Sequence, residues 1–381
     1  MTVWIKDFFK RETVLCTALV LAVLSAFFVP PDAAYGQYID FRTLATLFCL
    51  MSVMAGLKKT GMFMQIARFL LKRVKSGRSL VLILMLLCFF FSMLITNDVA
   101  LITFVPFTFI VLSLLGEEKK GRLLLPVVAM QTIAANLGSM LTPIGNPQNL
   151  YLYGKAGLSV ADFSALMLPY TIASLVLLTG WALRQGEHLR EAFQFNEGSL
   201  DGQEAEKRTG SGAVFVYLFL FVLCLLSVGH ILPWQAVFGI VLVVIFVTDR
   251  QVFAEVDYAL LVTFAGFFIF IGNVGRIKLF RDFLQELLTG REVYTAIIAS
   301  QVISNVPAAL LLSGFTEDYA GLIVGTNLGG LGTLIASMAS LISYKYIARE
   351  ESGRKGEYIR IFSVSNLCFL AGLAALYFVI S

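Results

Sequence analysis

The amino-acid sequence predicts an all-α polytopic membrane protein made of two inverted repeats, and three observations lead to this class. Of the 381 residues, 58% are hydrophobic and only 14% are charged, with a mean hydropathy of +0.82. Soluble domains carry far more charge. Apolar runs of about 17–25 residues, the length that spans a bilayer, recur along the chain. The second half also repeats three blocks of the first half in the same order.

The apolar runs predict about nine full spans and two re-entrant hairpins. At 1.5 Å per residue, an eleven-residue run reaches only about 16 Å, roughly half the hydrocarbon thickness. The runs 293–303 and 306–316 are therefore assigned to one hairpin, and 79–116 is treated in the same way. In order, the expected helices lie at about 13–30, 41–57, 79–95, 98–116, 123–153, 162–183, 213–229, 234–248, 258–275, 293–303, 306–316, 320–346 and 360–380.

Two amphipathic segments, 61–75 and 277–289, precede the hairpins, and we expect them to lie along opposite membrane surfaces. The polar segment between the halves is rich in Glu, Gly, Gln and Lys and predicts a flexible cytoplasmic linker. Repeat 1 is predicted at 13–184, with its hairpin at 79–116 and its broken helix at 123–153. The linker at 185–212 and a linking span at 213–229 follow it. Repeat 2 is predicted at 234–381, with its hairpin at 293–316 and its broken helix at 320–346.

Lysine and arginine residues divide unequally between the two faces of this topology. With the N-terminus inside, 23 of the 29 fall on cytoplasmic segments. The remaining six are Arg42, Lys155, Arg276, Lys278, Arg281 and Arg291. By the positive-inside rule we expect a bacterial-type inner-membrane protein with a cytoplasmic N-terminus and an external C-terminus. The basic start and first apolar run resemble a signal peptide, but we expect a retained span because the rest of the chain is also apolar.

The repeats are visible in three blocks of sequence. NLGSMLTPIGNPQNLYLYGK from Asn136 is echoed by NLGGLGTLIASMASLISYKY from Asn327, and TNDVALI from Thr96 is echoed by SNVPAAL from Ser304. Upstream, IDFRTLATLFCLMSVMAGLKKTGMF resembles VDYALLVTFAGFFIFIGNVGRIKLF. Agreement in order and spacing indicates a duplication. Because the odd span at 213–229 separates the copies, the repeats are expected to be inverted.

Inverted repeats with interrupted helices at matching positions are typical of secondary transporters whose site lies near the bilayer midplane. The first copy has three glycines, two prolines and four amides in twenty residues. Non-helical backbone within a membrane is tolerated only where protein or a water-filled cavity satisfies it. We therefore expect breaks at Gly138–Asn149 and Gly329–Ser340 to form a binding surface.

The hairpin tips predict the complementary half of the site. Thr96–Asn97 and Ser304–Asn305 suit N-caps of two half-helices whose positive ends favour an anion. Carbonyls released in the breaks, together with amides, are expected to hold Na⁺ or organise water for a proton. The expected substrate contacts are Thr96, Asn97, Asn146, Pro147, Ser304, Asn305, Thr333 and Ser337. The expected ion-coupling residues, and Na⁺ ligands if sodium is the ion, are Asn97, Asp98, Asn136, Gly138, Thr142, Gly145, Asn149, Asn305, Asn327 and Gly329.

Asp98 stands apart because its counterpart in the second repeat is Val306. A carboxylate at a buried tip should be paired with a cation or protonatable, so it is a candidate for coupling. The alternative role is to stabilise its half-helix through the helix dipole. Asp40 and Asp257 are expected to be helix caps. For the glycines and amides the alternative is close helix packing.

Other classes of function find no support in the motifs. The sequence has no Walker A loop, HExxH or GxSxG motif, so we expect no ATP hydrolysis, no proteolysis and no enzyme activity. Its five cysteines are scattered singly, and its two histidines are too separated for a metal site. We expect no cofactor besides Na⁺ or H⁺ as coupling ion. The expected partners are a small anion and the lipid bilayer, with no nucleic acid.

The motifs NDVALITFVP, NLGSMLTPIGNPQNL, SNVPAAL and NLGGLGTLIASMASL resemble those of the ion transporter superfamily, over nearly the whole chain. That group includes divalent anion/sodium symporters, citrate transporters, the arsenical pump membrane protein and some Na⁺/H⁺ antiporters. The resemblance implies an elevator-type carrier, often a homodimer, whose hairpins and broken helices slide against a scaffold. The dicarboxylate branch has Ser-Asn-Thr at both tips, whereas here the third residue is Asp98 or Val306. The Asn-Val-Pro tip is more similar to the arsenite-permease-like branch, and GNPQN to the anion symporters.

The sequence thus predicts a secondary active transporter for a small carboxylate, sulfate-like or arsenite-like anion, driven by Na⁺ or H⁺. One rival is a Na⁺/H⁺ antiporter in which Asp98 carries the ion. Another is a channel or a non-transporting membrane scaffold. Because Gly145-Asn146-Pro147 faces Ala336-Ser337-Met338 in the second copy, we expect the first half to supply more of the ion coordination.

Overall fold

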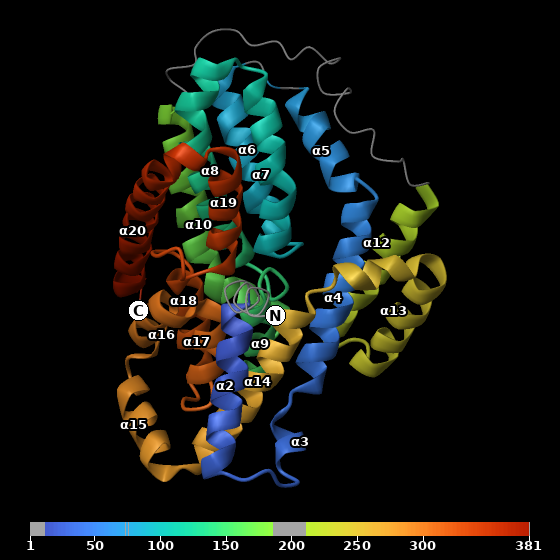
Figure 1. Ribbon diagram of the computed structural model, residues 1–381, viewed down its shortest axis with the longest axis vertical. Coiled ribbons are helices and arrows are strands. Elements are labelled where there is room, and N and C mark those ends of the chain that lie inside the picture. The colour runs from blue at the N-terminus through green and yellow to red at the C-terminus, as the bar shows by residue number, and fades with distance from the viewer. Residues whose placement is uncertain (1–11, 73, 75, 186–210, 381) are drawn as a thin grey trace, which may run out of the picture.

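The regular elements are all helices in the computed structural model, which describes residues 12–72, 74, 76–185 and 211–380 (Figure 1). This confirms the all-helical class. The expected linker at 185–212 falls almost entirely outside the described residues. The first half contains α2 (Thr13–Phe28), α3 (Tyr35–Tyr38), α4 (Phe41–Lys59), α5 (Met62–Leu71), α6 (Gly77–Ser92), α7 (Asn97–Ser113), α8 (Glu117–Ser139), α9 (Pro147–Ala156) and α10 (Val160–Gln185).

In the second half, as in the first, a long helix is followed by a short helix and then by the two helices of a hairpin. It contains α12 (Ser211–Val228), α13 (Trp234–Asp249), η2 (Arg250–Glu255), α14 (Tyr258–Arg276), α15 (Lys278–Leu288), α16 (Glu292–Ile303), α17 (Asn305–Leu312), α18 (Tyr319–Gly329), α19 (Met338–Glu350), η3 (Ser352–Arg354) and α20 (Lys355–Ile380). The caps expected before α4 and α14 are present, since Asp40 accepts from the Thr43 N–H at 3.0 Å and Asp257 from the Leu260 N–H at 2.9 Å. Local sequence therefore sets where these helices begin.

Helix breaks separate α8 from α9 and α18 from α19. The first break covers 140–146 and ends at Pro147, which can start a helix but cannot continue one. The second covers 330–337. Both breaks lie near the middle of the molecule in Figure 1. The helices α8 and α19 lie together above the breaks in this view, and α9 and α18 lie together on the other side.

Five described helices are long and apolar enough to cross a membrane, fewer than the nine full spans expected. They are Phe41–Lys59, Val160–Gln185, Trp234–Glu255, Tyr258–Arg276 and Ser352–Ile380. Two of the expected spans, 13–30 and 213–229, form shorter apolar helices, and two others, 123–153 and 320–346, are each divided by a break. At 1.5 Å per residue, the 16 residues of α2 reach about 24 Å, short of a typical hydrocarbon core.

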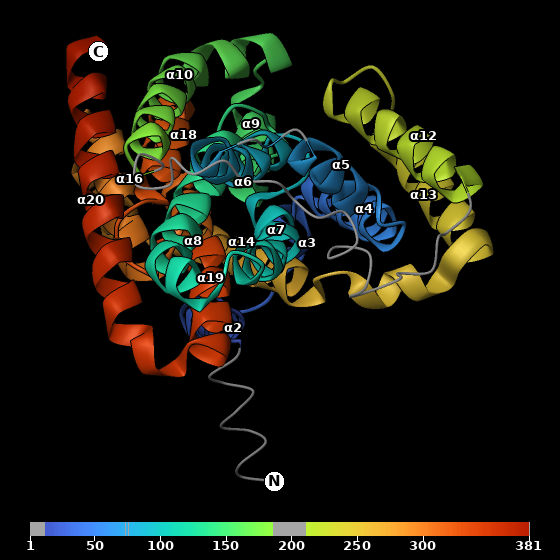
Figure 2. The same cartoon turned by 90° about the horizontal axis from the view of Figure 1, so that it is seen from above.

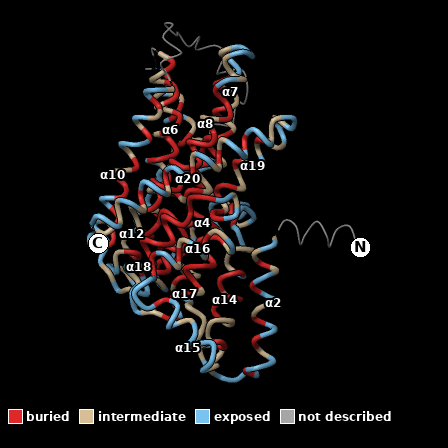
Figure 3. Tube along the Cα trace, turned by 90° about the vertical axis from the view of Figure 1, so that its left-hand side faces the viewer, coloured by how far each residue is buried: buried red, intermediate tan, exposed pale blue. Residues whose placement is uncertain are grey.

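Burial follows the expectation for a bundle embedded in lipid. Buried positions gather on α6, α7 and α8, and α8 is buried nearly all round from Leu123 onward (Figure 3). Large apolar side chains cover the outside instead, as on α2, α13 and α20, where Phe27, Val247 and Phe378 are more than three-quarters exposed. Seen from above, α12 and α13 stand at one edge beside α4, and α20 at the opposite edge (Figure 2). The molecule is a multi-pass membrane protein.

Candidate functional site

The tip of the first hairpin, between α6 and α7, is bonded to the first helix break. The Asn97 N–H donates to the Gly145 carbonyl at 3.2 Å, and the Thr142 hydroxyl donates to the Met93 carbonyl at 2.5 Å. The Thr96 hydroxyl accepts from the Val99 N–H at 3.5 Å, as an N-cap. Backbone groups that leave the helices at the tip and the break thus satisfy one another.

The tip of the second hairpin makes matching contacts with the second break. The Asn305 N–H donates to the Ala336 carbonyl at 2.9 Å, and the Thr333 hydroxyl donates to the Gln301 carbonyl at 3.2 Å. In the aligned repeats, Asn305 and Ala336 correspond to Asn97 and Gly145, and Thr333 and Gln301 correspond to Thr142 and Met93. The Gln301 side chain adds donors to the carbonyls of Gly329 and Leu331, at 3.0 and 2.9 Å. We did not predict Gln301, although a glutamine inside an apolar hairpin is a signal for a buried hydrogen bond.

The expectation that Ser304 caps α17 with its side chain is wrong. Its φ of 73° departs from the extended conformation of an N-cap residue, and its side chain makes no capping hydrogen bond. The Asn305 Oδ1 atom accepts from the Val306 N–H instead, at 3.0 Å. Asn97 does the same for the N–H of Asp98, at 2.9 Å. At the first tip this amide contact accompanies the Thr96 cap, and at the second tip it stands in place of a Ser304 cap.

Buried amides link the two halves of the chain. The Asn136 Oδ1 atom accepts from Asn97 Nδ2 at 2.8 Å and from Ser337 Oγ at 3.0 Å. Its Nδ2 donates to the Gly330 carbonyl at 3.4 Å. Asn327, the repeat counterpart of Asn136, donates to Asn149 Oδ1 at 2.7 Å. Each NLG asparagine therefore reaches the other half, and the amides of Asn97, Asn136, Asn149 and Asn327 link the two halves at the breaks.

The first break has additional internal hydrogen bonds. Asn146 Nδ2 donates to Ser139 Oγ at 2.6 Å, and Asn149 Nδ2 donates to the carbonyls of Ser139 and Thr142 at 3.2 and 3.4 Å. Ser139, which we did not single out, thus anchors both amides.

Two of the three glycines expected to couple ions, Gly138 and Gly329, lie at close helix crossings. A Cβ atom at Gly138 would lie 2.0 Å from the Phe89 carbonyl oxygen on α6. At Gly329 it would lie 2.6 Å from Ser300 Oγ on α16. Each broken helix thus packs its glycine against the first helix of its own hairpin. This geometry matches the alternative of close packing.

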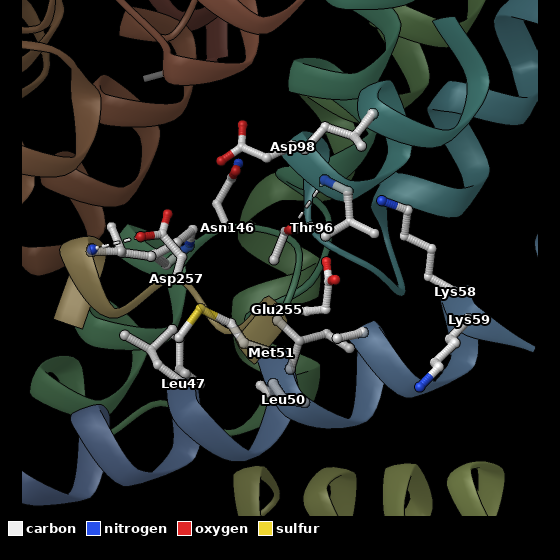
Figure 4. Close-up of a pocket in the computed structure, with 17 residues that line it drawn as sticks. Leu47, Leu50, Met51, Lys58, Lys59, Thr96, Asp98, Asn146, Glu255 and Asp257 are labelled. Atoms are coloured by element: carbon white, nitrogen blue, oxygen red, sulfur yellow. Dashed lines mark hydrogen bonds between the residues drawn. The ribbon is translucent and has the colours of Figure 1, made fainter. Parts of the chain in front are cut away.

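A cavity of about 440 Å³ opens beside the first tip (Figure 4). Of the expected site residues, Thr96, Asp98, Asn146 and Pro147 line it, and the side chains of Asp98 and Asn146 point toward one another. The Oδ1 atom of Asp98 is buried and accepts no hydrogen bond from the described residues. A buried oxygen of this kind can take a proton or a cation.

The opposite wall of this cavity comes from α4 and from the segment before α14. It carries Lys58, Lys59, Glu255 and Asp257 among apolar residues such as Leu47 and Met51. Lys59 also forms an ion pair with Asp249 at 2.6 Å. In the sequence, the two lysines indicate only the orientation of the chain in the membrane, and Asp257 is expected only to cap a helix. Their place at a cavity depends on packing between distant segments.

The second tip has much less space around it. Ser304 borders a cavity of about 20 Å³ together with Val306, Pro307 and Met338. Asn305, Ser337 and Asn327 are buried in the hydrogen-bonded cluster, and Thr333 is exposed and lines none of these cavities. The open space therefore lies on the side of the first repeat.

Comparisons with known proteins give this architecture a family. The model of a family described as "Citrate transporter" matches residues 1–339. Inner membrane protein YbiR of Escherichia coli K12 is 32% identical over 86% of each chain. The uncharacterized transporter MJ0456 of Methanocaldococcus jannaschii is 28% identical over 88% of this chain and 89% of its own. The silicon efflux transporter LSI3 of Oryza sativa subsp. japonica is 35% identical over 42% of this chain and 32% of its own.

These matches confirm the resemblance to the ion transporter superfamily, and the family match includes both hairpins and both helix breaks. Two of these relatives, MJ0456 and LSI3, are named as transporters. This chain belongs to the citrate transporter family.

Proposed function

We propose that this protein is a secondary active transporter that moves a small anion or oxyacid across the inner membrane, coupled to Na⁺ or H⁺. The observation that carries the proposal is the pairing of each hairpin tip with a helix break, Asn97 N–H with Gly145 and Asn305 N–H with Ala336. The first of these pairs lies beside the cavity of about 440 Å³. Such pairing places the positive end of the α7 helix dipole beside this cavity, where it favours an anion. The cavity of about 440 Å³ is the proposed substrate site.

We also propose that the halves are inverted repeats that work as an elevator-type carrier, with the N-terminus inside and the C-terminus outside. Reciprocal packing supports this, because α8 lies beside α19 while α9 lies beside α18, and α7 contacts α19 while α17 contacts α9. The segment before the break in each repeat thus packs against the segment after the break in the other repeat. A homodimer is part of the same proposal and rests on the resemblance to the superfamily.

Charge in the proposed site suits a small anion that travels with a cation or proton. Lys58 and Lys59 border the cavity and would raise the local concentration of anions. Asp98, Glu255 and Asp257 line the same space and would repel an anion unless a cation or proton accompanied it. The family description names citrate, and the name of the rice relative names silicon. Both belong in the test panel.

The decisive experiment is uptake by proteoliposomes containing the purified full-length protein. Citrate, sulfate, arsenite and silicic acid are each tested with an imposed Na⁺ gradient, an imposed H⁺ gradient, or neither. We expect one substrate to accumulate only with one gradient. Liposomes without protein are the control. Uptake that reaches equilibrium but never exceeds it would indicate a channel.

A Na⁺/H⁺ antiporter is the second candidate, favoured by the buried Oδ1 atom of Asp98 that accepts no hydrogen bond. The same vesicles loaded with a pH-sensitive dye distinguish the two candidates. An antiporter would move protons when Na⁺ is added in the absence of every anion in the panel. Sodium-dependent proton movement without anion uptake would overturn the anion proposal.

A further inference from the structure

We infer that a second cavity, on the far side of Leu150 from the proposed substrate site, is the other end of the same substrate path, and that Leu150 closes the path in this conformation. The inference rests on the proposed transport function. The second cavity has a volume of about 200 Å³. Its lining includes Asp40, which caps α4, Arg42 and Thr46 of α4, Tyr153 of α9 and Ser227 of α12.

Both cavities are lined by α4 and α9, but by different parts of these helices. On α4 and its cap, positions 40–46 line the second cavity and positions 47–59 line the first. On α9, positions 150–154 line the second cavity, while 147 and 150 line the first. Among the described residues, Leu150 is shared by both linings. The boundary therefore crosses α4 between Thr46 and Leu47 and crosses α9 at Leu150.

This boundary lies within a helix that crosses the membrane. Arg42 and Lys58 are sixteen positions apart on α4, which is about 24 Å at 1.5 Å per residue. The cavities consequently approach opposite ends of α4. Leu150 is only 6% exposed and presents an apolar side chain between two partly polar cavities. An ion would have to leave water to pass it, which is costly.

Contacts one turn beyond Leu150 hold this barrier in place. The Tyr153 hydroxyl donates to the Val228 carbonyl at 2.9 Å, and the Tyr153 ring stacks on His230 at 5.5 Å between ring centroids. Arg42 contacts the same histidine ring. These contacts tie α9 to the segment that follows α12 and to the start of α4. In this conformation, these contacts therefore fix the position of the barrier.

The chemistry of the second cavity suits the same class of substrate. Arg42 gives it a cation, as Lys58 and Lys59 do for the first cavity. The Asp40 carboxylate beside it accepts from the Thr43 N–H and hydroxyl, at 3.0 and 2.5 Å. A small anion would then meet a cation at each end of the path and an apolar barrier between them.

Cysteine labelling tests this arrangement. In the full-length chain with its five cysteines replaced by alanine, Ala55→Cys reports on the first cavity and Gly154→Cys on the second. A Cβ atom at Gly154 meets no atom within 4 Å. A charged, membrane-impermeant methanethiosulfonate reagent is applied to right-side-out and to inside-out vesicles. We expect each cysteine to react from one side only, and the two from opposite sides.

Adding Leu150→Ala should make each cysteine reactive from both sides, because the shared wall is lost. Leu152→Ala is the matched control, since Leu152 is fully buried on the same helix and lines neither cavity. It should leave labelling one-sided. Size-exclusion elution checks folding, and Leu150→Val replaces Leu150→Ala if that variant does not elute as the parent does.

Two outcomes would overturn the inference: both cysteines reacting from the same side, or labelling that stays one-sided in the well-folded Leu150 variant. The measurement involves no substrate. One-sided labelling combined with absent uptake would therefore count against the proposed function alone, and gradient-driven uptake with same-side labelling would count against the barrier alone.

Discussion

Asparagine residues connect the two halves of this molecule at its centre. Asn136 and Asn327 occupy equivalent repeat positions, yet their partners differ, because Asn136 meets Asn97 and Ser337 while Asn327 meets Asn149. The asymmetry leaves room beside the first tip, where Asp98 replaces the apolar Val306 of the second. In the described part of the chain, the two similar tips thus border cavities of very different volume, about 440 and 20 Å³.

Asp98→Asn should separate coupling from binding. The amide keeps the size of the side chain but can neither take up a proton nor carry a negative charge. If Asp98 couples transport, substrate exchange survives while gradient-driven accumulation is lost. Both are measured in proteoliposomes with a labelled substrate. Unchanged accumulation would leave Asp98 only its role at the helix N-terminus.

Gly138→Ala should destabilise the folded protein, because the added Cβ atom would lie 2.0 Å from the Phe89 carbonyl oxygen. Overpacking of this kind costs about 1–3 kcal/mol. The measurement is the thermal unfolding midpoint in detergent. Gly121→Ala on the same helix is the control, since no atom lies within 4 Å there, and it should be neutral or slightly stabilising. Equal midpoints for the two variants would contradict the close crossing.

The residues of the candidate site differ in how far sequence reveals them. Asn146 and Asp98 were predictable because polar groups inside apolar runs must have a partner or a function. Gly138 also stood out in the sequence, but its pattern did not distinguish ion coupling from packing. Leu150 gave no signal, since one leucine in an apolar run looks like any other. Its importance depends on which two cavities it separates.

At the scale of helices, the start of the chain is tied to the second half by the packing of α2 against α14. Asp32, in the connection after α2, accepts from Arg276 Nη1 at 2.7 Å. Asn273 Nδ2 donates to Ser25 Oγ at 3.0 Å and to the Tyr35 hydroxyl at 2.8 Å. Sequence predicted both helices but gave no sign that they pair. Their contact comes from the tertiary structure.

The Asp32 contact should make part of the stability depend on pH. Its hydrogen bond with Arg276 lowers the pKa of the Asp32 carboxyl below the ordinary value. A lowered folded-state pKa stabilises the protein above the unfolded pKa of about 3.9 and loses that effect as pH falls through the folded pKa. The wild type should therefore unfold at a higher temperature than Asp32→Asn at pH 7, and the gap should close in acid.

Differential scanning fluorimetry across this pH range measures the gap. Asp282→Asn is the control, because Asp282 forms only an exposed pair with the adjacent Arg281 at 3.5 Å and should change the midpoint little at any pH. A gap between wild type and Asp32→Asn that stays constant down to acid pH would show that the ion pair is not its source.

For the whole molecule, the unequal distribution of basic residues and the odd linking span predict a C-terminus outside the membrane. Alkaline phosphatase fused after Ser381 should be active in intact bacteria, and a green fluorescent protein fusion there should be dark, because each folds on one side only. The same reporters fused after Gln185, at the end of α10, should give the opposite result. A fluorescent C-terminal fusion would contradict the predicted topology.

The sequence by itself determined the class of molecule, the main helices and the positions of both breaks, because hydropathy, Pro147 and capping residues such as Asp40 act locally. It also exposed the duplication. Only the tertiary structure decided that Ser337 meets Asn136 across 201 positions, and that Lys58 and Leu150 border a cavity. The physical reason is that such contacts depend on how helices pack, and packing brings together residues that no local pattern connects.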